Sequence, residues 1–350
     1  MAPICKAFNK FSNSTRHKLC HTGQHFDTKM SQIFFDQLDL PNPDFYLGIN
    51  GGSQTEMTAR IMQEFEKIAL AEKPDLILVP GDVNSTLACG LVASKLGIEI
   101  GHIESGLRSF DRSMPEEINR IVTDVIADHL FVTEQSGVDN LTMEGVDKNK
   151  IHLVGNVMID SLINLLPQIN QSSILQSMNI RPEEYILVTF HRPSNVDEFD
   201  YLLNLINYLN ELSKDIPIVF PIHPRTRNNL QNQGIDIELE PTSNFILTEP
   251  IGYIDFLALT KSAKIVITDS GGIQEETTFL QVQCVTVRDN TERPITVDIG
   301  TNHLVGTDIN DVKQTVTSIL NGKLKKGEIP QYWDGRTSER IVNILLKNEI

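Results

Sequence analysis

Short apolar runs alternate with longer segments of helical periodicity along most of the chain. The longer segments place apolar side chains three or four positions apart, as at Ile61, Phe65 and Ile68. This alternation is typical of parallel sheets covered by helices on both faces, so we predict an α/β fold. The apolar runs predict strands at 18–22, 75–79, 98–103, 129–133, 185–190, 218–222, 264–268 and 283–287.

The periodic pattern is weakest at 164–184, where Pro, Gln, Ser and Asn are frequent. The chain has 350 residues, and a domain usually has about 100 to 200. We therefore predict an N-terminal domain of residues 1–166 and a C-terminal domain of residues 167–334.

Both ends of the chain predict helices. At the start, Ile4 and Ala7 have helical spacing, although a doubly wound domain normally opens with a buried strand and a phosphate-binding loop. The segment 335–350 places Ile341 and Leu345 on one face of a helix. We expect this last helix to pack back on the first domain.

Composition limits the classes of partner. The chain has 40% hydrophobic and 22% charged residues, enough apolar material for a packed interior. Its formal net charge of −16 repels nucleic acid and anionic membranes. No apolar run approaches the ~18 residues of a membrane span, and the four cysteines lack disulfide or zinc spacing. We expect a cytoplasmic protein without a metal site, nucleic-acid partner or membrane partner.

Ligands of parallel sheets bind beyond the carboxyl ends of the strands, and the loop at 268–276 is the sharpest candidate there. Ser270, Gly271 and Gly272 separate a strand from a helix, so free amides and the helix dipole favour an anion such as a diphosphate. Glu276 lies one turn into that helix and suits the hydroxyls of a ribose. The alternative interpretation is a turn whose glycines only relieve packing.

Carboxylates follow two strands in the front half of the sequence. Asp82 and Glu104 come directly after apolar runs, and Glu116 and Glu117 open the next predicted helix. Carboxylates gathered at one crevice repel one another, which raises at least one pKa toward a value useful in proton transfer. Helix capping is the alternative for Asp82, Glu116 and Glu117, whereas a Glu104 that ends a buried run needs a partner.

Basic and polar side chains follow the strands of the back half. Histidine and arginine at strand ends can neutralise a leaving diphosphate, although an isolated histidine in such a turn is more often structural. The sequence contains no GxGxxG, GxSxG or P-loop motif. The candidates are His191, Arg192, Asn195, His223, Arg225, Arg227, Arg288 and Arg293.

The order of motifs resembles that of the non-hydrolysing UDP-N-acetylglucosamine 2-epimerases. The motifs are GDVNST, HIESGLRSFDRSMPEEINR, GNVMID, HRPSN, PIHPRTR, TDSGGIQEE, RDNTERP and the closing WDGRTSERIVNIL. The resemblance implies two Rossmann-like doubly wound domains facing each other across a cleft, as in glycosyltransferase-B enzymes, and a homodimer. It implies that UDP is eliminated to leave a 2-acetamidoglucal and adds back to give UDP-N-acetylmannosamine, without a cofactor.

The resemblance also assigns roles to residues. Asp82, Glu104 and Glu116 match the family's catalytic carboxylates, and His191 matches its catalytic histidine. The residues that match its substrate contacts are Ser270, Gly271, Gly272, Glu276, Arg293, His223, Arg192 and Asn195.

Some family members are activated by a second molecule of UDP-N-acetylglucosamine. Gln24, His25 and Arg60 are similar to residues of that regulatory site, with Arg192 and His223. The surrounding TGQHFD text differs from the alanine-containing version associated with this regulation.

One part of the family pattern is missing. Members begin with a strand and a loop of the form G-[TA]-R-P, whose arginine helps to hold the nucleotide sugar, whereas Ala2 and Pro3 follow the initiator here. We expect the missing first strand to leave a groove in the first sheet with unpaired amide groups and exposed apolar side chains. A misplaced start codon or a truncated gene is our hypothesis for this difference.

Three alternative functions stay open. A hydrolysing 2-epimerase releases UDP and free N-acetylmannosamine by the same chemistry. A 2-epimerase of the same kind acts instead on a 2,3-diacetamido uronic acid sugar nucleotide, and this is the second alternative. A non-catalytic nucleotide-sugar binder is favoured by the missing arginine loop. A glycosyltransferase shares the glycine loop but does not need three carboxylates near C2.

Overall fold

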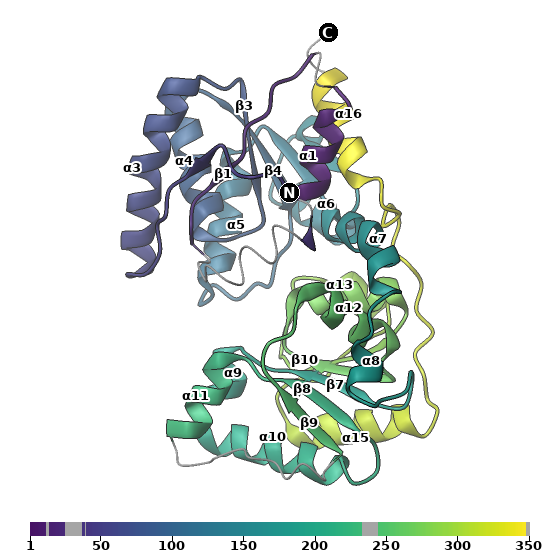
Figure 1. Ribbon diagram of the computed structural model, residues 1–350. Coiled ribbons are helices and arrows are strands. Elements are labelled where there is room, and N and C mark those ends of the chain that lie inside the picture. Colours follow the sequence, from purple (N-terminus) through teal and green to yellow (C-terminus); the bar gives the residue numbers. More distant parts are fainter. Residues whose placement is uncertain (12–13, 25–36, 39, 233–243, 348–350) are drawn as a thin grey trace. The chain divides into compact units, whose positions relative to one another are not determined.

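The computed structural model describes residues 1–350 except 12–13, 25–36, 39, 233–243 and 348–350 (Figure 1). The chain divides into two compact units. We call residues 1–163 and 331–350 the N-terminal unit, and residues 164–330 the C-terminal unit. The sheets of both units are parallel and carry helices on both faces, which confirms the predicted α/β class.

The strands found in the described residues of the N-terminal unit form two groups. Strands β1 and β2 pair with each other, and a four-stranded sheet has the order β3-β4-β5-β6. Among the described residues, no strand hydrogen bonds join β1 to β3. The elements are α1 (Ala2–Asn9), β1 (Cys20–His21), β2 (Phe45–Tyr46), α3 (Gln54–Glu72), β3 (Leu76–Pro80), α4 (Asn84–Leu96), β4 (Glu99–Ser105), α5 (Pro115–Ile126), β5 (His129–Val132), α6 (Gln135–Met143), η1 (Lys148–Lys150), β6 (Ile151–Leu153) and α16 (Thr337–Lys347). Helix α7 (Val157–Ile169) begins in this unit and ends in the C-terminal unit.

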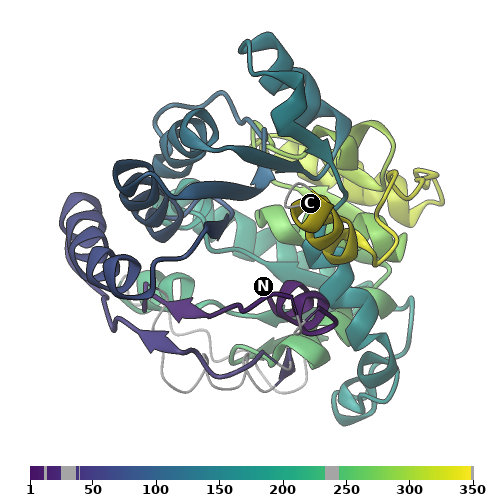
Figure 2. The same ribbon diagram turned by 90° about the horizontal axis from the view of Figure 1, so that it is seen from above.

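Helices α3 and α4 cover one face of the four-stranded sheet, where Ile61 and Phe65 of α3 are buried against Val79 of β3. On the other face, Ile4 of α1 and Ile341 of α16 share a buried cluster with strand residues. Figures 1 and 2 both show α1 and α16 side by side. The helical spacing at both ends of the sequence therefore reflects two helices that pack together on the N-terminal unit.

Buried polar contacts fix the returning C-terminal segment. The indole Nε1 of Trp333 donates to the Thr133 carbonyl at 3.1 Å. The carboxylate of Asp160 accepts from Thr337 N at 3.1 Å and Ser338 N at 2.7 Å, which satisfies amides at the start of α16. Gly155 allows the close approach, because a Cβ there would lie 2.1 Å from the Tyr332 carbonyl oxygen.

In the described residues of the C-terminal unit, six strands form a parallel sheet in the order β12-β11-β10-β7-β8-β9. Helices α10 and α15 contribute to the core on one face, and α8, α12 and α13 contribute to the core on the other. The strand order reverses between β10 and β7, the kind of position where open sheets bind ligands. The elements are α8 (Ile174–Ser177), β7 (Ile186–Thr189), α9 (Pro193–Val196), α10 (Phe199–Leu212), β8 (Ile218–Pro221), α11 (Pro224–Asn232), β9 (Phe245–Thr248), α12 (Tyr253–Ser262), β10 (Ile265–Thr268), α13 (Gly271–Leu280), β11 (Gln283–Thr286), α14 (Pro294–Asp298), β12 (Asn302–Leu304) and α15 (Ile309–Leu320).

Each apolar run that predicts a strand overlaps an observed strand. The observed strands without such a prediction are β2, β6, β9 and β12, and all of them lie at sheet edges. Among the described helices, none has both the length and the apolar content needed to cross a membrane.

Replacing Gly155 with Ala is expected to loosen the C-terminal segment. Gly155 has φ 98°, and a Cβ there would also lie 2.8 Å from Thr337 Oγ1. The left-handed backbone costs about 1 to 2 kcal/mol for a residue with a Cβ, and overpacking adds about 1 to 3 kcal/mol. Urea denaturation should show this loss as a lower midpoint.

The matched control is Gly145→Ala. Gly145 has φ 81°, but a Cβ there meets nothing within 4 Å, so only the backbone cost applies. Equal losses in the two variants would show that contact with Tyr332 does not matter for stability.

Candidate functional site

The predicted catalytic carboxylates lie in the N-terminal unit. Asp82 is in the loop after β3, Glu104 is next to the last residue of β4, and Glu116 is in the first turn of α5. Asp82 is partly exposed and accepts a hydrogen bond from the buried guanidinium of Arg120. The Asp82 carbonyl accepts from Asn119 Nδ2 at 2.9 Å. Helix α5 therefore holds both the backbone and the side chain of Asp82, and Arg120 offsets its negative charge.

Glu116 and Glu117 are adjacent but differ in burial. Glu116 is exposed, whereas the side chain of Glu117 is 1% exposed and pairs with Arg120. Glu117 also accepts from Ser109 N and Phe110 N, both at 2.9 Å. Glu117 thus organises the loop after β4, and the exposed Glu116 is the one of the two that a ligand can reach.

Glu104 lies beside the loop that carries Asp82. A Cβ on Gly81 would lie 4.0 Å from Glu104 Oε2, so the end of β4 is adjacent to the loop that carries Asp82. Glu104 has φ 67°, and the pairing of β4 with β5 shifts register between Ile103 and Ser105. A non-glycine residue in this conformation at a strand end is often part of a functional site.

Sequence reasoning missed Arg120. The signal was present in the motif MPEEINR, because Glu117 and Arg120 are three residues apart and so share one face of a helix. This spacing predicts the pair of Glu117 with Arg120, but it carries no signal of the contact between Arg120 and Asp82, which are 38 positions apart in the sequence.

In the C-terminal unit, Asp269 joins the loops after β7 and β10. Its buried carboxylate accepts from the backbone amides of His191 at 3.0 Å and Arg192 at 2.9 Å, and from Asn195 Nδ2 at 3.1 Å. It also lies 3.0 Å from His191 Nδ1. Burial raises the pKa of Asp269, but His191 and these donors outweigh it, so the pKa lies below the usual value.

This arrangement orients His191. With Nδ1 held by Asp269, the other ring nitrogen is left to meet a ligand, and the side chain is 41% exposed. The His223 ring centroid lies 5.7 Å from that of His191. Burial and the neighbouring His191 lower the pKa of His223, although Asp269 partly opposes them.

The glycine loop begins α13, as predicted. Ser270 is the N-cap residue, and Arg293 packs so closely on Gly271 that a Cβ there would lie 2.7 Å from Arg293 Nη1. Arg293 pairs with Glu275 at 2.9 Å, and Glu292 lies 3.7 Å from its Nη1. Two carboxylates therefore fix the arginine beside the start of the helix.

Glu276 is buried in α13 and accepts from the Tyr253 hydroxyl at 2.8 Å. Burial raises the pKa of Glu276 to about 7, although the hydrogen bond from Tyr253 opposes the rise. The single hydrogen bond from Tyr253 does not offset the burial of this carboxylate, as expected of a group that accepts from the hydroxyls of a bound ligand.

Other predicted cations already have protein partners. Arg225 forms a bidentate pair with Asp197, and Arg227 pairs with Glu249 at 2.7 Å. Arg192 lies 3.7 Å from Glu292. Arg288 pairs with the same carboxylate at 2.9 Å. Burial raises the pKa of Glu292, but the charges of Arg293 and Arg288 outweigh burial and lower the pKa to about 2.

Asn195 acts as a link between loops. It is fully buried, and its Nδ2 donates to Asp269 and to the Val287 carbonyl at 3.0 Å.

The predicted regulatory residues are only partly described, because His25 lies outside the described residues. Gln24 accepts from Ser85 N at 2.9 Å at the start of α4, and Arg60 donates to the backbone of the loop before α3.

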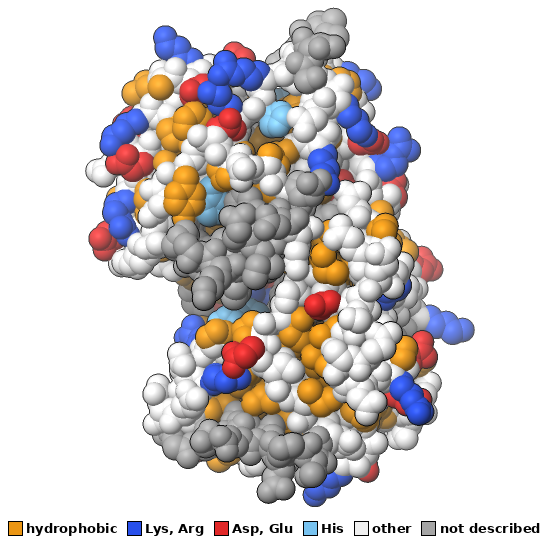
Figure 3. All heavy atoms as spheres, in the orientation of Figure 1, with side chains coloured by type: hydrophobic (Ala, Val, Ile, Leu, Met, Phe, Trp, Pro, Cys, Tyr) orange, Lys and Arg blue, Asp and Glu red, His pale blue; other side chains and the backbone are white. Residues whose placement is uncertain are grey.

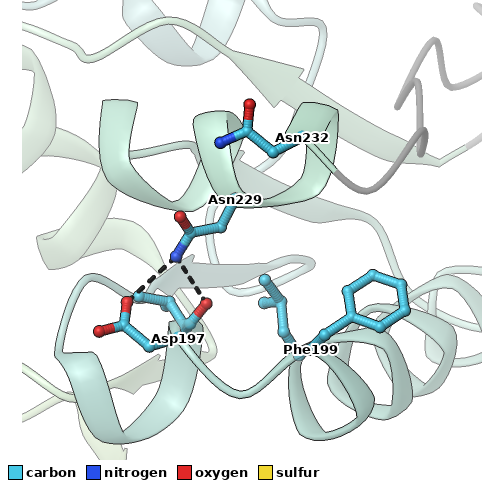
Figure 4. Close-up of a pocket in the computed structure, with 6 residues that line it drawn as sticks. Asp197, Phe199, Asn229 and Asn232 are labelled. Carbon is cyan, nitrogen blue, oxygen red and sulfur yellow. Dashed lines mark hydrogen bonds between the residues drawn. The ribbon is translucent and has the colours of Figure 1, made fainter.

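A cavity of about 120 Å³ lies among α9, α10 and α11 (Figure 4). Its lining includes Asp197 and Asn229, and Asn229 Nδ2 donates to the Val196 carbonyl at 2.8 Å and to Asp197 Oδ1 at 3.1 Å. Ligand pockets usually measure about 300 to 1,000 Å³, so this cavity is too small for a nucleotide sugar.

On the face drawn in Figure 3, basic and acidic side chains are interspersed. In the part of the chain that the structure describes, no group of three or more His, Cys, Asp or Glu side chains is placed to hold a metal ion.

Comparison with known proteins gives a consistent picture. Residues 8–346 match the model of the family described as UDP-N-acetylglucosamine 2-epimerase. The UDP-N-acetylglucosamine 2-epimerase of Methanococcus maripaludis is 44% identical over 332 residues, 93% of this chain and 90% of the relative. The UDP-2,3-diacetamido-2,3-dideoxy-D-glucuronate 2-epimerase of Pseudomonas aeruginosa is 42% identical, over 94% of this chain and 91% of the relative.

A solved structure of similar fold is that of the Methanocaldococcus jannaschii UDP-GlcNAc 2-epimerase in complex with UDP-GlcNAc and UDP. The TM-score is 0.90 at 42% identity, covering 99% of this chain and 95% of that one.

The raised pKa of Glu276 predicts a pH dependence of stability. The unfolded carboxyl titrates near 4.5 and the folded one near 7, so the contribution of Glu276 is complete below pH 4.5 and is lost as pH rises to 7. The loss amounts to up to about 3 kcal/mol. Glu276→Gln should remove it, so urea denaturation between pH 5 and 8 should give a flatter profile than for the unmodified chain.

The control is Glu211→Gln, on the exposed face of α10 in the same unit. Parallel profiles for Glu276→Gln and the unmodified chain would mean that Glu276 ionises freely in the folded state.

Proposed function

The chain belongs to the UDP-N-acetylglucosamine 2-epimerase family, and we propose that it interconverts UDP-N-acetylglucosamine and UDP-N-acetylmannosamine. The observation that carries the proposal is the adjacency of Glu104 to the Asp82 loop, beside a helix that presents Glu116. Inverting a carbon centre next to a leaving group requires acid and base groups near one carbon, and these loops supply them.

The C-terminal unit is proposed to hold UDP. The start of α13 at Ser270 and Gly271 offers backbone amides to the diphosphate, as helix N-termini do. Glu276 accepts from the ribose hydroxyls. His191, oriented by Asp269, donates a hydrogen bond to the diphosphate as negative charge develops on it.

The N-terminal unit is proposed to move the proton at C2. One carboxylate removes this proton while the C1–O bond breaks and UDP leaves with the bonding electron pair, which yields a 2-acetamidoglucal. A second carboxylic acid returns a proton to the opposite face of C2, and UDP adds back at C1. Asp82, Glu104 and Glu116 are the candidates for these roles.

A second candidate substrate deserves the same assay. The Pseudomonas aeruginosa relative is named for a 2,3-diacetamido glucuronate nucleotide and is about as similar in sequence as the relatives named for UDP-N-acetylglucosamine. Its chemistry at C2 is the same, so the two substrates differ only in groups at C3 and C5.

We also propose that the protein is cytoplasmic and forms a homodimer. Sedimentation velocity would test the dimer.

Incubation with UDP-N-acetylglucosamine in heavy water should place deuterium at C2 and yield UDP-N-acetylmannosamine. Proton and mass spectra of the sugar nucleotides measure both. Accumulation of free N-acetylmannosamine would point to the hydrolysing reaction, and the absence of any exchange to a non-catalytic binder.

Asp82→Asn and Glu104→Gln should each lower kcat by about 100-fold or more, since general acid–base groups contribute about 10²- to 10⁴-fold. Affinity for UDP, measured by calorimetry, should change little in both. Glu66→Gln, an exposed substitution on α3 of the same unit, is the control. Near-normal kcat in Asp82→Asn and Glu104→Gln would remove these carboxylates from the mechanism.

A further inference from the structure

A network of charged groups, buried except for the exposed Glu144, runs behind the Asp82 loop and the end of β4 in the N-terminal unit. His102 of β4 is fully buried, with its Nδ1 2.6 Å from Asp124 Oδ1 and its Nε2 2.8 Å from the Gly81 carbonyl oxygen. Asp124 Oδ2 accepts from Arg108 Nη1 at 2.7 Å. Arg108 in turn pairs with Glu144 at 2.7 Å. This network of charged side chains therefore links β4, α5 and the end of α6.

Both ring nitrogens of His102 face acceptors, since a carbonyl oxygen and a carboxylate cannot donate. The ring must donate at both positions, so it is an imidazolium. Burial lowers the pKa of His102, but Asp124, the Gly81 carbonyl and the nearby charge of Glu104 outweigh it and raise the pKa overall. Arg108 and Glu144 are the other charged side chains of this network.

The contacts of Asp124 bracket Glu104. His102 lies two residues before Glu104, and Gly106, whose amide donates to Asp124 Oδ2 at 3.1 Å, lies two residues after it. Glu104 sits between them with φ 67°. A left-handed conformation costs a non-glycine residue about 1 to 2 kcal/mol, so its neighbours must hold it.

The same imidazolium fixes the neighbouring loop. Gly81 is bonded to β4 through both of its backbone groups, because its amide donates to the Ile103 carbonyl at 2.9 Å and its carbonyl accepts from His102. The Gly81 carbonyl belongs to the peptide plane that leads into Asp82. The orientation of this plane sets the direction in which the Asp82 side chain leaves the backbone.

We propose that His102 is a positioning residue that, as a buried imidazolium held by Asp124, sets the relative placement of Asp82 and Glu104. The proposal rests on the proposed function for its catalytic consequence. Buried ion pairs are seldom more stabilising than well-packed apolar residues of similar volume, so stability alone gives little reason for this one. The constraint that this ion pair places on the geometry of the two catalytic segments gives a better reason.

Two substitutions separate the two bonds of the ring. The Asn amide nitrogen can take the place of Nδ1, so His102→Asn keeps a donor to Asp124 and loses the one to Gly81. The Gln amide nitrogen can take the place of Nε2, so His102→Gln keeps a donor to Gly81 and loses the one to Asp124. The control is His129→Gln on the neighbouring strand β5, whose partner Glu99 lies on the exposed rim.

We expect kcat to fall by about 100-fold in His102→Asn, the scale on which misplacement of reacting groups by about 1 Å lowers rates. His102→Gln should retain more activity, and KM and UDP affinity should change little in both. A role in stability alone predicts that kcat follows the folded fraction equally in the two variants, and this result would overturn the positioning role.

A second measurement does not depend on activity. Nitrogen-15 NMR of the imidazole should show both His102 nitrogens protonated from pH 5 to 8. A neutral ring in this range would overturn the proposal even in an active enzyme. If the ring is charged but the unmodified chain exchanges no deuterium at C2, the proposed function fails. The hydrogen bond by which His102 fixes the Gly81 carbonyl is then still supported.

Discussion

The strand-end loops of each unit depend on one buried aspartate. A carboxylate removed from water is tolerated only when donors surround it, and those donors are then fixed in place. Asp124 collects His102, Gly106 and Arg108 in the N-terminal unit. In the C-terminal unit, Asp269 collects the backbone and side-chain donors of the segment from His191 to Asn195. In both units the need to compensate one charge determines where the neighbouring functional groups lie.

The two aspartates share an electrostatic consequence. Burial alone raises the pKa of each carboxyl, yet the cations and amides around it lower the pKa below its usual value. A lowered pKa stabilises the folded state above the ordinary range of an aspartate, and this stabilisation is lost as pH falls through the folded value. Acid should therefore loosen the loops around Asp124 and around Asp269.

The central strands could be predicted from the sequence, and several edge strands could not. Strands β8 and β10 are buried along their whole length, so each reads as a nearly continuous apolar run. The missed strands β2, β6, β9 and β12 lie at edges and are only partly buried. The apolar run of β9, from Phe245 to Leu247, is only three residues long, which is short for a strand. Their position follows from pairing with a neighbour, which a local pattern does not contain.

The candidate site shows the same division. The carboxylates and the glycine loop could be found because they stand directly after apolar runs, at 79–86, 102–109 and 268–276. The residues that orient them, Arg120 for Asp82 and Asp269 for His191, could not be identified in this way, because each acts on a side chain far away in the sequence. Charge compensation in three dimensions decides these pairs, and periodicity carries no information about it.

The path of the chain through the two units also bears on how the protein is made. The C-terminal unit is a continuous stretch, whereas the N-terminal unit includes residues 331–350. During synthesis, the middle of the chain can therefore complete its own core while the first unit still lacks α16, whose Ile341 is fully buried there. Domains generally fold from the amino terminus onward on the ribosome. Here the order of completion is reversed, and the first unit closes only after the last helix has emerged.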